Sequence, residues 1–204
     1  SFHHAGVRRY GANTLWLLAE KTVRVAVGFS VGVYVARCLG PAQYGLLNYA
    51  ISFVALFSVF SSLGLDAILV RELVRTPQRA NVLMGSSLLL KLGGFGIMAS
   101  CVGIVLLFSG TAESRLLIWI ILSGYFFQSF QVLDYFFQAR VQGKYVAISQ
   151  MAALLATAAG RVLLALNQAP LWSFALMETT YVLLASLCCW GFYRKGGACL
   201  RQWR

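Results

Sequence analysis

Long apolar runs constrain the fold of this chain more than any other feature of its sequence. A helix needs about 20 apolar residues to cross about 30 Å of hydrocarbon. Runs of this kind lie near residues 13–38, 43–66, 81–108, 115–139, 145–166 and 171–193. They are too long for strands and do not alternate between apolar and polar residues. The sequence therefore predicts an all-α, polytopic membrane protein, with residues 1–204 forming one bundle of six transmembrane helices.

The composition excludes an ordinary soluble domain. Only 11% of the 204 residues are charged and 59% are apolar, whereas about 25% of a soluble domain is charged. The formal net charge of +11 does not indicate nucleic-acid binding, because the basic residues form no soluble polar face. Turn-forming residues separate the apolar runs, among them Gly40-Pro41, Thr76-Pro77 and 167–170, and proline is favoured where a helix begins.

The basic residues in the short loops predict the orientation, since Lys and Arg are retained on the cytoplasmic side of a membrane. Only Arg37 and Arg115 fall on one side. On the other side lie eleven basic residues: Arg8, Arg9, Arg71, Arg75, Arg79, Arg140, Lys144, Arg194, Lys195, Arg201 and Arg204. We therefore expect both termini to be cytoplasmic, which agrees with an even number of spans.

Seven ionisable residues lie inside the apolar runs, where each costs about 2.5 to 3.5 kcal/mol and normally faces protein or water. Arg24 is the most central of them by residue count, and we expect it to matter most. The four cations outnumber the three anions in the set, which comprises Glu20, Lys21, Arg24, Lys91, Asp134, Arg161 and Glu178.

Helical spacing gathers polar residues on one face of several spans. Gln128, Gln131, Asp134 and Gln138 share a stripe on the fourth span, Gln150, Thr157 and Arg161 share one on the fifth, and Asp66 ends a polar face of the second. Such stripes predict a hydrated cavity with a mildly cationic lining, suited to a phosphate-bearing substrate. The alternative is that the charges pair as structural contacts, Glu20 with Arg24, Lys91 with Asp134 and Arg161 with Glu178.

The residues that many membrane enzymes need are missing from the spans. The two histidines, His3 and His4, lie in the N-terminal tail, which excludes an intramembrane serine protease that needs a histidine base. The sequence contains no HExxH motif, paired-cysteine metal spacing or phosphate-binding loop. We therefore expect no metal and no cofactor, and transport or binding instead of catalysis.

Two segments resemble the polysaccharide flippases of the O-antigen (Wzx) type. The first combines Ala-Arg-Cys-Leu-Gly-Pro-Ala-Gln-Tyr-Gly-Leu-Leu-Asn-Tyr-Ala at residues 36–50 with Leu-Gly-Leu-Asp at 63–66. The second combines Asp-Tyr-Phe-Phe-Gln-Ala at 134–139 with Gly-Lys-Tyr at 143–145 and is similar to that family's fourth helix and following loop. The resemblance covers nearly the whole chain.

The resemblance implies a member of the multidrug/oligosaccharidyl-lipid/polysaccharide exporter superfamily, in which two bundles surround a central cationic cavity. Such proteins flip undecaprenyl-diphosphate-linked oligosaccharides, such as the O-antigen repeat unit of lipopolysaccharide, across the bacterial inner membrane by alternating access. By this likeness Arg24 contacts the diphosphate or an anionic sugar, assisted by Lys91 and Arg161. Gln128, Gln131 and Asp134 complete the expected substrate site, and the structural or coupling candidates are Glu20, Lys21, Asp66 and Glu178.

Family members are roughly twice as long as this chain, so the resemblance also implies the N-terminal half of a transporter. Its expected partners are the lipid bilayer, the lipid-linked oligosaccharide and a second six-helix bundle, either a C-terminal half or a second copy of the chain. A different class of function is a non-transporting module, or truncated product, that dimerises through small-residue faces such as Gly28 and Gly32. A third is a membrane enzyme acting on polyprenyl substrates through Asp134 or Glu178.

Overall fold

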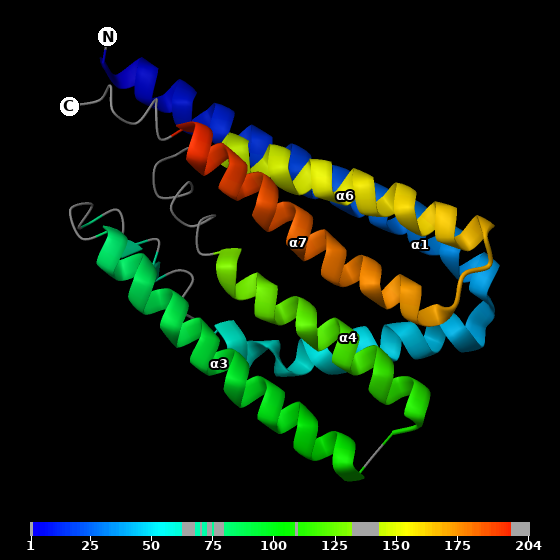
Figure 1. Cartoon of the computed structure of the whole chain (residues 1–204). Coiled ribbons are helices and arrows are strands. Elements are labelled where there is room, and N and C mark those ends of the chain that lie inside the picture. Colours follow the sequence, from blue (N-terminus) through cyan, green and yellow to red (C-terminus); the bar gives the residue numbers. More distant parts are fainter. Residues whose placement is uncertain are drawn as a thin grey trace.

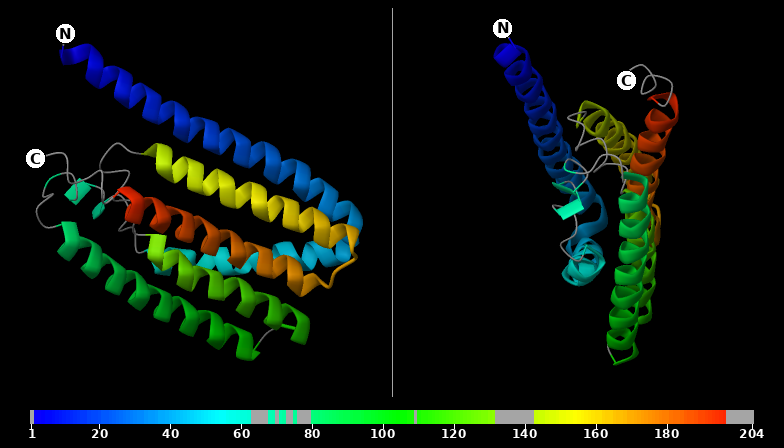
Figure 2. Two further views of the ribbon diagram at one scale, coloured as in Figure 1. Left: turned by 45° about the horizontal axis from the view of Figure 1, so that its top comes forward. Right: turned by 90° about the vertical axis from the view of Figure 1, so that its left-hand side faces the viewer.

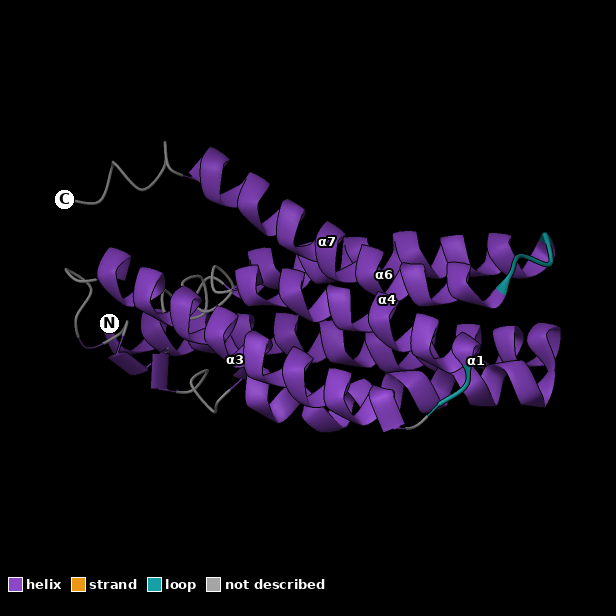
Figure 3. Ribbon diagram, turned by 60° about the horizontal axis from the view of Figure 1, so that its bottom comes forward, coloured by secondary structure: helices purple, strands orange, loops and turns teal. Residues whose placement is uncertain are grey.

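The computed structural model describes residues 2–62, 68–69, 71–72, 75, 80–108, 110–131 and 143–196. Most of these residues form α-helices, with short loops at 110–111 and 167–170 (Figure 3). The helices are α1 (Phe2–Ser62), α3 (Ala80–Phe108), α4 (Ala112–Gln128), α6 (Gly143–Leu166) and α7 (Leu171–Gly196), and α4 continues into the short 3₁₀ helix η2 (Ser129–Gln131). The expected all-α class is confirmed for the described part of the chain.

The described residues form five α-helices and do not support the six-helix count. The first two predicted spans are joined in the 61-residue helix α1, where Gly40 is the residue with non-helical backbone angles (φ 76°, ψ 166°) and Pro41 follows inside the helix. A single residue with these angles is enough to redirect a helix, so the four-residue gap expected between the spans is not needed. Figure 1 shows α1 turning back at this point. We call residues 2–39 and 41–62 its first and second arms.

The Gly40 backbone conformation is one that essentially only glycine adopts, and other residues placed there cost about 1 to 3 kcal/mol. Nothing lies within 4 Å of a Cβ built at Gly40. We therefore expect Gly40→Ala to destabilise the protein by about this amount through backbone strain alone. Thermal unfolding in detergent is the measurement, with Gly45→Ala as the control, since Gly45 has equally open surroundings and no positive φ. An unchanged melting temperature for Gly40→Ala would contradict the assignment.

The helices form an elongated bundle. In the left panel of Figure 2, the first arm of α1, α6, α7, α4 and α3 lie in that order, and α1 also packs against α3 and α4. The start of α1 and the end of α7 lie at one end, whereas the bend of α1 and the α6–α7 connection lie at the other (Figure 1). The buried core joins α1, α3 and α4 with the facing ends of α6 and α7. Its largest fully buried side chains are Val54, Met98, Val102, Leu117, Ile118 and Leu122.

Four described helices are long and apolar enough to cross a membrane, over Leu18–Ser61, Gly85–Phe108, Val146–Leu166 and Leu171–Gly191. The first of these is 44 residues long, about twice what one crossing needs. The remaining helix, α4, has 17 residues and begins at Ala112, directly after the cap Thr111 and three residues before the predicted span. It ends at Gln128 and continues into η2, and the part of the predicted polar stripe beyond Gln131 lies outside the described residues. The chain is a multi-pass membrane protein.

Close helix contacts use small residues, as is usual between helices in lipid. A Cβ on Gly124 of α4 would lie 3.4 Å from the Cα of Thr179 on α7, and the Thr179 hydroxyl donates to the Ile120 carbonyl over 3.0 Å. A Cβ on Gly160 of α6 would lie 2.9 Å from the Met177 sulfur. The absence of these Cβ atoms keeps α7 in close contact with both neighbours.

Candidate functional site

Arg24 on the first arm of α1 connects three helices through polar contacts. Its Nε donates to the Glu20 carboxylate over 2.7 Å, and its Nη2 donates to the Gln150 Oε1 of α6 over 2.5 Å. Its guanidinium carbon also lies 5.5 Å from the centre of the Tyr181 ring on α7, a distance typical of a cation–π contact. Glu20 is buried at 5% exposure, whereas the Arg24 side chain remains 41% exposed. Arg24 is therefore held in place but accessible.

A second ion pair joins α6 to α7. The Arg161 Nη2 lies 2.6 Å from the Glu178 Oε1, and each side chain is about one-third exposed. The Arg161 Nε is buried and has no hydrogen-bond partner. Since a buried donor without a partner costs free energy, this nitrogen is suited to an acceptor that enters from outside the protein, such as water or an oxyanion.

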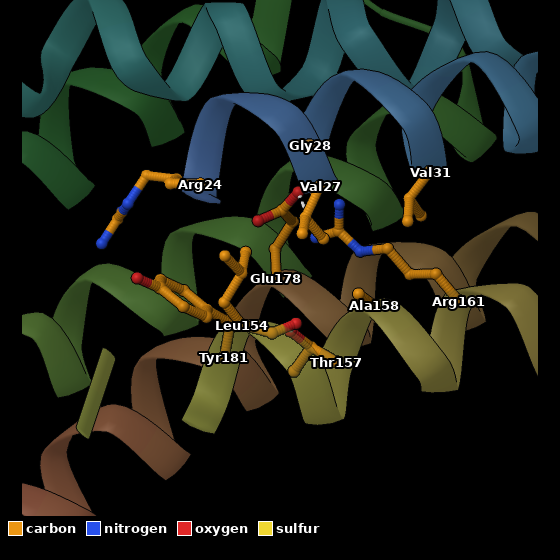
Figure 4. A pocket seen from close by; sticks show the side chains of 10 residues that line it. All are labelled: Arg24, Val27, Gly28, Val31, Leu154, Thr157, Ala158, Arg161, Glu178 and Tyr181. Atoms are coloured by element: carbon orange, nitrogen blue, oxygen red, sulfur yellow. Dashed lines mark hydrogen bonds and ion pairs between the residues drawn. The ribbon is translucent and has the colours of Figure 1, made fainter. Parts of the chain in front are cut away.

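One pocket lies between the two arginines. Figure 4 shows Arg24 reaching away from the Arg161–Glu178 pair and toward Tyr181, so that the pocket lies between two polar ends. Its volume is about 170 Å³, room for about six waters at about 30 Å³ each, which is enough for a phosphate-sized group. The remaining lining residues are Val27, Gly28, Val31, Leu154, Thr157 and Ala158.

The charges around this pocket are largely paired. Arg24 and Arg161 each contact one carboxylate, so the mildly cationic lining predicted from the sequence is instead close to neutral in the described residues. Two of the three ion pairs proposed as structural contacts are formed. A guanidinium carries five N–H donors, more than Glu20 and Gln150 can occupy at Arg24. An oxyanion can therefore bind beside the pairs or displace a carboxylate from one of them.

The pocket covers about a third of the hydrocarbon thickness of about 30 Å. On α6 its lining runs from Leu154 to Arg161, about 10 Å at 1.5 Å per residue. Thr157 lies between them on the same face and also lines the pocket. The polar stripe predicted on this helix thus faces the pocket, which offers two arginines at different depths in the membrane.

The other predicted site residues lie elsewhere. Lys91 on α3 is buried at 6% exposure, but it does not line the Arg24 pocket. Lys21 and Gln128 are exposed and also lie outside its lining. Asp66, Asp134 and the Gln131 side chain fall outside the described residues, as does the expected Lys91–Asp134 pair.

Sequence reasoning missed Tyr181, which lines the pocket and contacts Arg24. The signal was present, because Tyr181 follows Glu178 by three residues and residues so spaced share a helix face.

An all-helical, multi-pass membrane protein with an arginine-lined pocket between three helices belongs to the class of transporters and lipid-handling membrane proteins, since ionisable groups inside a membrane usually mark a substrate path. Residues 10–201 match the sequence model of a protein family whose description is "Polysaccharide biosynthesis protein". The chain belongs to this flippase-type family, which confirms the resemblance drawn from its sequence. No curated protein and no solved structure matches the chain.

Proposed function

We propose that this chain moves a polyprenyl-diphosphate-linked oligosaccharide across the bacterial inner membrane by alternating access. The observation that carries this function is the pocket between Arg24 and Arg161, in a chain of the polysaccharide biosynthesis family. Its small volume suits the diphosphate, which every lipid-linked repeat unit shares. The sugars then extend beyond the pocket, so the pocket itself does not select among them.

Ion pairing explains how such a pocket can stand empty in a membrane. An isolated guanidinium in hydrocarbon is costly, and Glu20 and Glu178 lower that cost while no substrate is bound. An arriving diphosphate offers several acceptor oxygens in a medium where charge interactions are stronger than in water. It can therefore replace carboxylate and water contacts at both arginines.

The proposed topology has six crossings. Each arm of α1 crosses once, and α3, α4, α6 and α7 supply the other four, so the termini return to the cytoplasmic side. This arrangement follows the basic residues on that side and the position of the start of α1 and the end of α7 at one end of the bundle (Figure 1). The second bundle of the transporter is a C-terminal half or a second copy of this chain.

Expression of this chain in bacteria that lack their own polysaccharide flippase tests the function directly. Rescue of surface polysaccharide supports transport, whereas failure to rescue supports the non-transporting module. The small residues expected to dimerise are partly engaged within the chain, since Gly28 lines the pocket and a Cβ built on Gly32 would lie 3.4 Å from the Tyr44 hydroxyl oxygen.

Gly28→Leu is expected to fill the pocket and weaken diphosphate binding at least tenfold without loss of stability. Nothing lies within 4 Å of a Cβ built at Gly28, although this residue lines the pocket, and leucine favours a helix more than glycine does. The measurement is thermal stabilisation of the protein in lipid nanodiscs by inorganic diphosphate. Gly93→Leu on α3 is the matched control, because its surroundings are equally open. Equal stabilisation of both variants would argue against this binding site.

A further inference from the structure

A second, larger pocket lies at the end of the bundle away from the start of α1 and the end of α7. Its volume is about 460 Å³, within the range of about 300–1,000 Å³ typical of small-molecule sites. It lies among the beginnings of three helical segments, namely the second arm of α1, α4 and α7, and shares no residue with the Arg24 pocket.

The lining of this pocket is mostly aliphatic, with one amide, one carboxylate and one indole side chain. Leucines and a proline, such as Leu46, Leu117 and Pro170, make up most of the surface. Gln43 from α1, Glu113 from α4 and Trp172 from α7 also line the pocket. Gln43 and Glu113 are exposed, and Trp172 is 47% exposed, so all three are available to a ligand.

Each of these three residues has an ordinary explanation when taken alone. Tryptophan is common at the membrane–water interface, and a glutamate in the first turn stabilises a helix through the helix dipole. Neither explanation accounts for an aromatic ring, a carboxylate and an amide from three helices meeting around one open volume. A few convergent polar groups in a largely apolar and aromatic pocket are typical of a ligand site.

We propose that this pocket binds one saccharide unit, so that the protein holds a lipid-linked oligosaccharide at two places. A sugar ring has C–H faces that pack against an indole and hydroxyl groups that both donate and accept hydrogen bonds. The Glu113 carboxylate accepts from hydroxyls, and the Gln43 amide both donates and accepts. A neutral or N-acetylated hexose satisfies all three residues.

That a single ligand reaches both pockets is an interpretation that rests on the proposed function. On α7, Trp172 precedes Glu178 by six residues, about 9 Å along the helix axis. Sugars attached to a diphosphate held at Arg24 and Arg161 extend beyond the Arg24 pocket.

Tryptophan emission tests the proposal in the intact chain, reconstituted in lipid nanodiscs. A variant that keeps Trp172 and replaces Trp16, Trp119, Trp190 and Trp203 by phenylalanine is titrated with N-acetylglucosamine. The matched control keeps only Trp119, which is 52% exposed on α4 and outside the pocket. We expect a saturable emission change from Trp172 and none from Trp119. An absent or unsaturable change at Trp172 would overturn the proposal.

Two further measurements identify the ligand that the pocket binds. Gln43→Leu with Glu113→Gln is expected to weaken sugar binding about tenfold or more, because hydrogen bonds to a charged group are among the stronger ones. Unaltered binding by this variant would exclude the saccharide contacts. Strong quenching of Trp172 by brominated phospholipid that the sugar does not relieve would show that a lipid chain occupies the pocket instead.

Diphosphate binding is measured in the same nanodiscs. Loss of the sugar response with intact diphosphate stabilisation contradicts only the saccharide pocket. A sugar response without diphosphate stabilisation contradicts the function proposed for the Arg24 pocket, and leaves the saccharide pocket supported.

Discussion

Arg24→Ala is expected to abolish export in cells whose surface polysaccharide depends on this protein. The substitution removes a guanidinium that contacts Glu20, Gln150 and Tyr181. It also leaves the Glu20 carboxylate buried without this partner, which costs about 3 kcal/mol, the lower end of the usual range because Arg24 is partly exposed. The measurements are surface polysaccharide and the amount of protein in the membrane.

A charge-balanced variant separates loss of substrate binding from loss of stability. Glu20→Gln combined with Arg24→Gln removes both charges together, so we expect near-normal protein levels and at least a tenfold loss of export. Arg37→Ala is the control, because Arg37 is an exposed arginine on the same arm of α1 and does not line the pocket. Normal export by the double variant would exclude substrate binding by Arg24.

Arg161→Met combined with Glu178→Leu is expected to keep the protein folded and to reduce export at least tenfold. Replacing a buried ion pair by apolar residues of similar size is often neutral or stabilising, whereas an oxyanion ligand loses its contact at Arg161. Each single substitution leaves one charge unpaired, and we expect it to cost about 2 kcal/mol because the pair is only partly buried. Thermal unfolding in nanodiscs and surface polysaccharide are measured for all three variants.

The control removes an exposed ion pair instead. Arg75 and Glu72 lie 3.8 Å apart, with the arginine side chain 67% exposed, so Arg75→Met with Glu72→Leu should leave export unchanged. If the Arg161–Glu178 double variant also exports normally, that pair serves only to hold α6 against α7.

The sequence predicts the helices of this protein better than it predicts their number. The span expected over 81–108 corresponds closely to α3, and that over 145–166 to α6, because long apolar runs have well-defined ends. The form of the break between the first two spans could not be predicted. Gly40 and Pro41 were recognised as a break, but only the backbone angles show that one glycine accommodates it without an intervening loop.

Contacts within a helix follow from spacing, whereas contacts between helices do not. Glu20 and Arg24 are four residues apart, and their pairing was anticipated for that reason. The bond from Arg24 to Gln150 joins residues 126 apart in the sequence, and depends on how α1 packs against α6. The polar stripe on α6 predicted which face of this helix points into the bundle. It did not predict that Gln150 on this face accepts a hydrogen bond from Arg24. Lys91 shows the converse, since its charge suggested a shared site with Arg24, whereas it does not line the Arg24 pocket.

The contact between Glu20 and Arg24 also has a consequence for biogenesis. Because both residues belong to the first arm of α1, their charges can compensate each other as soon as that arm is helical. Gln150 and Tyr181 are made more than a hundred residues later. The nascent arm can therefore leave the translocon and enter lipid with its most costly side chain already neutralised, and wait there for the later helices to be synthesised.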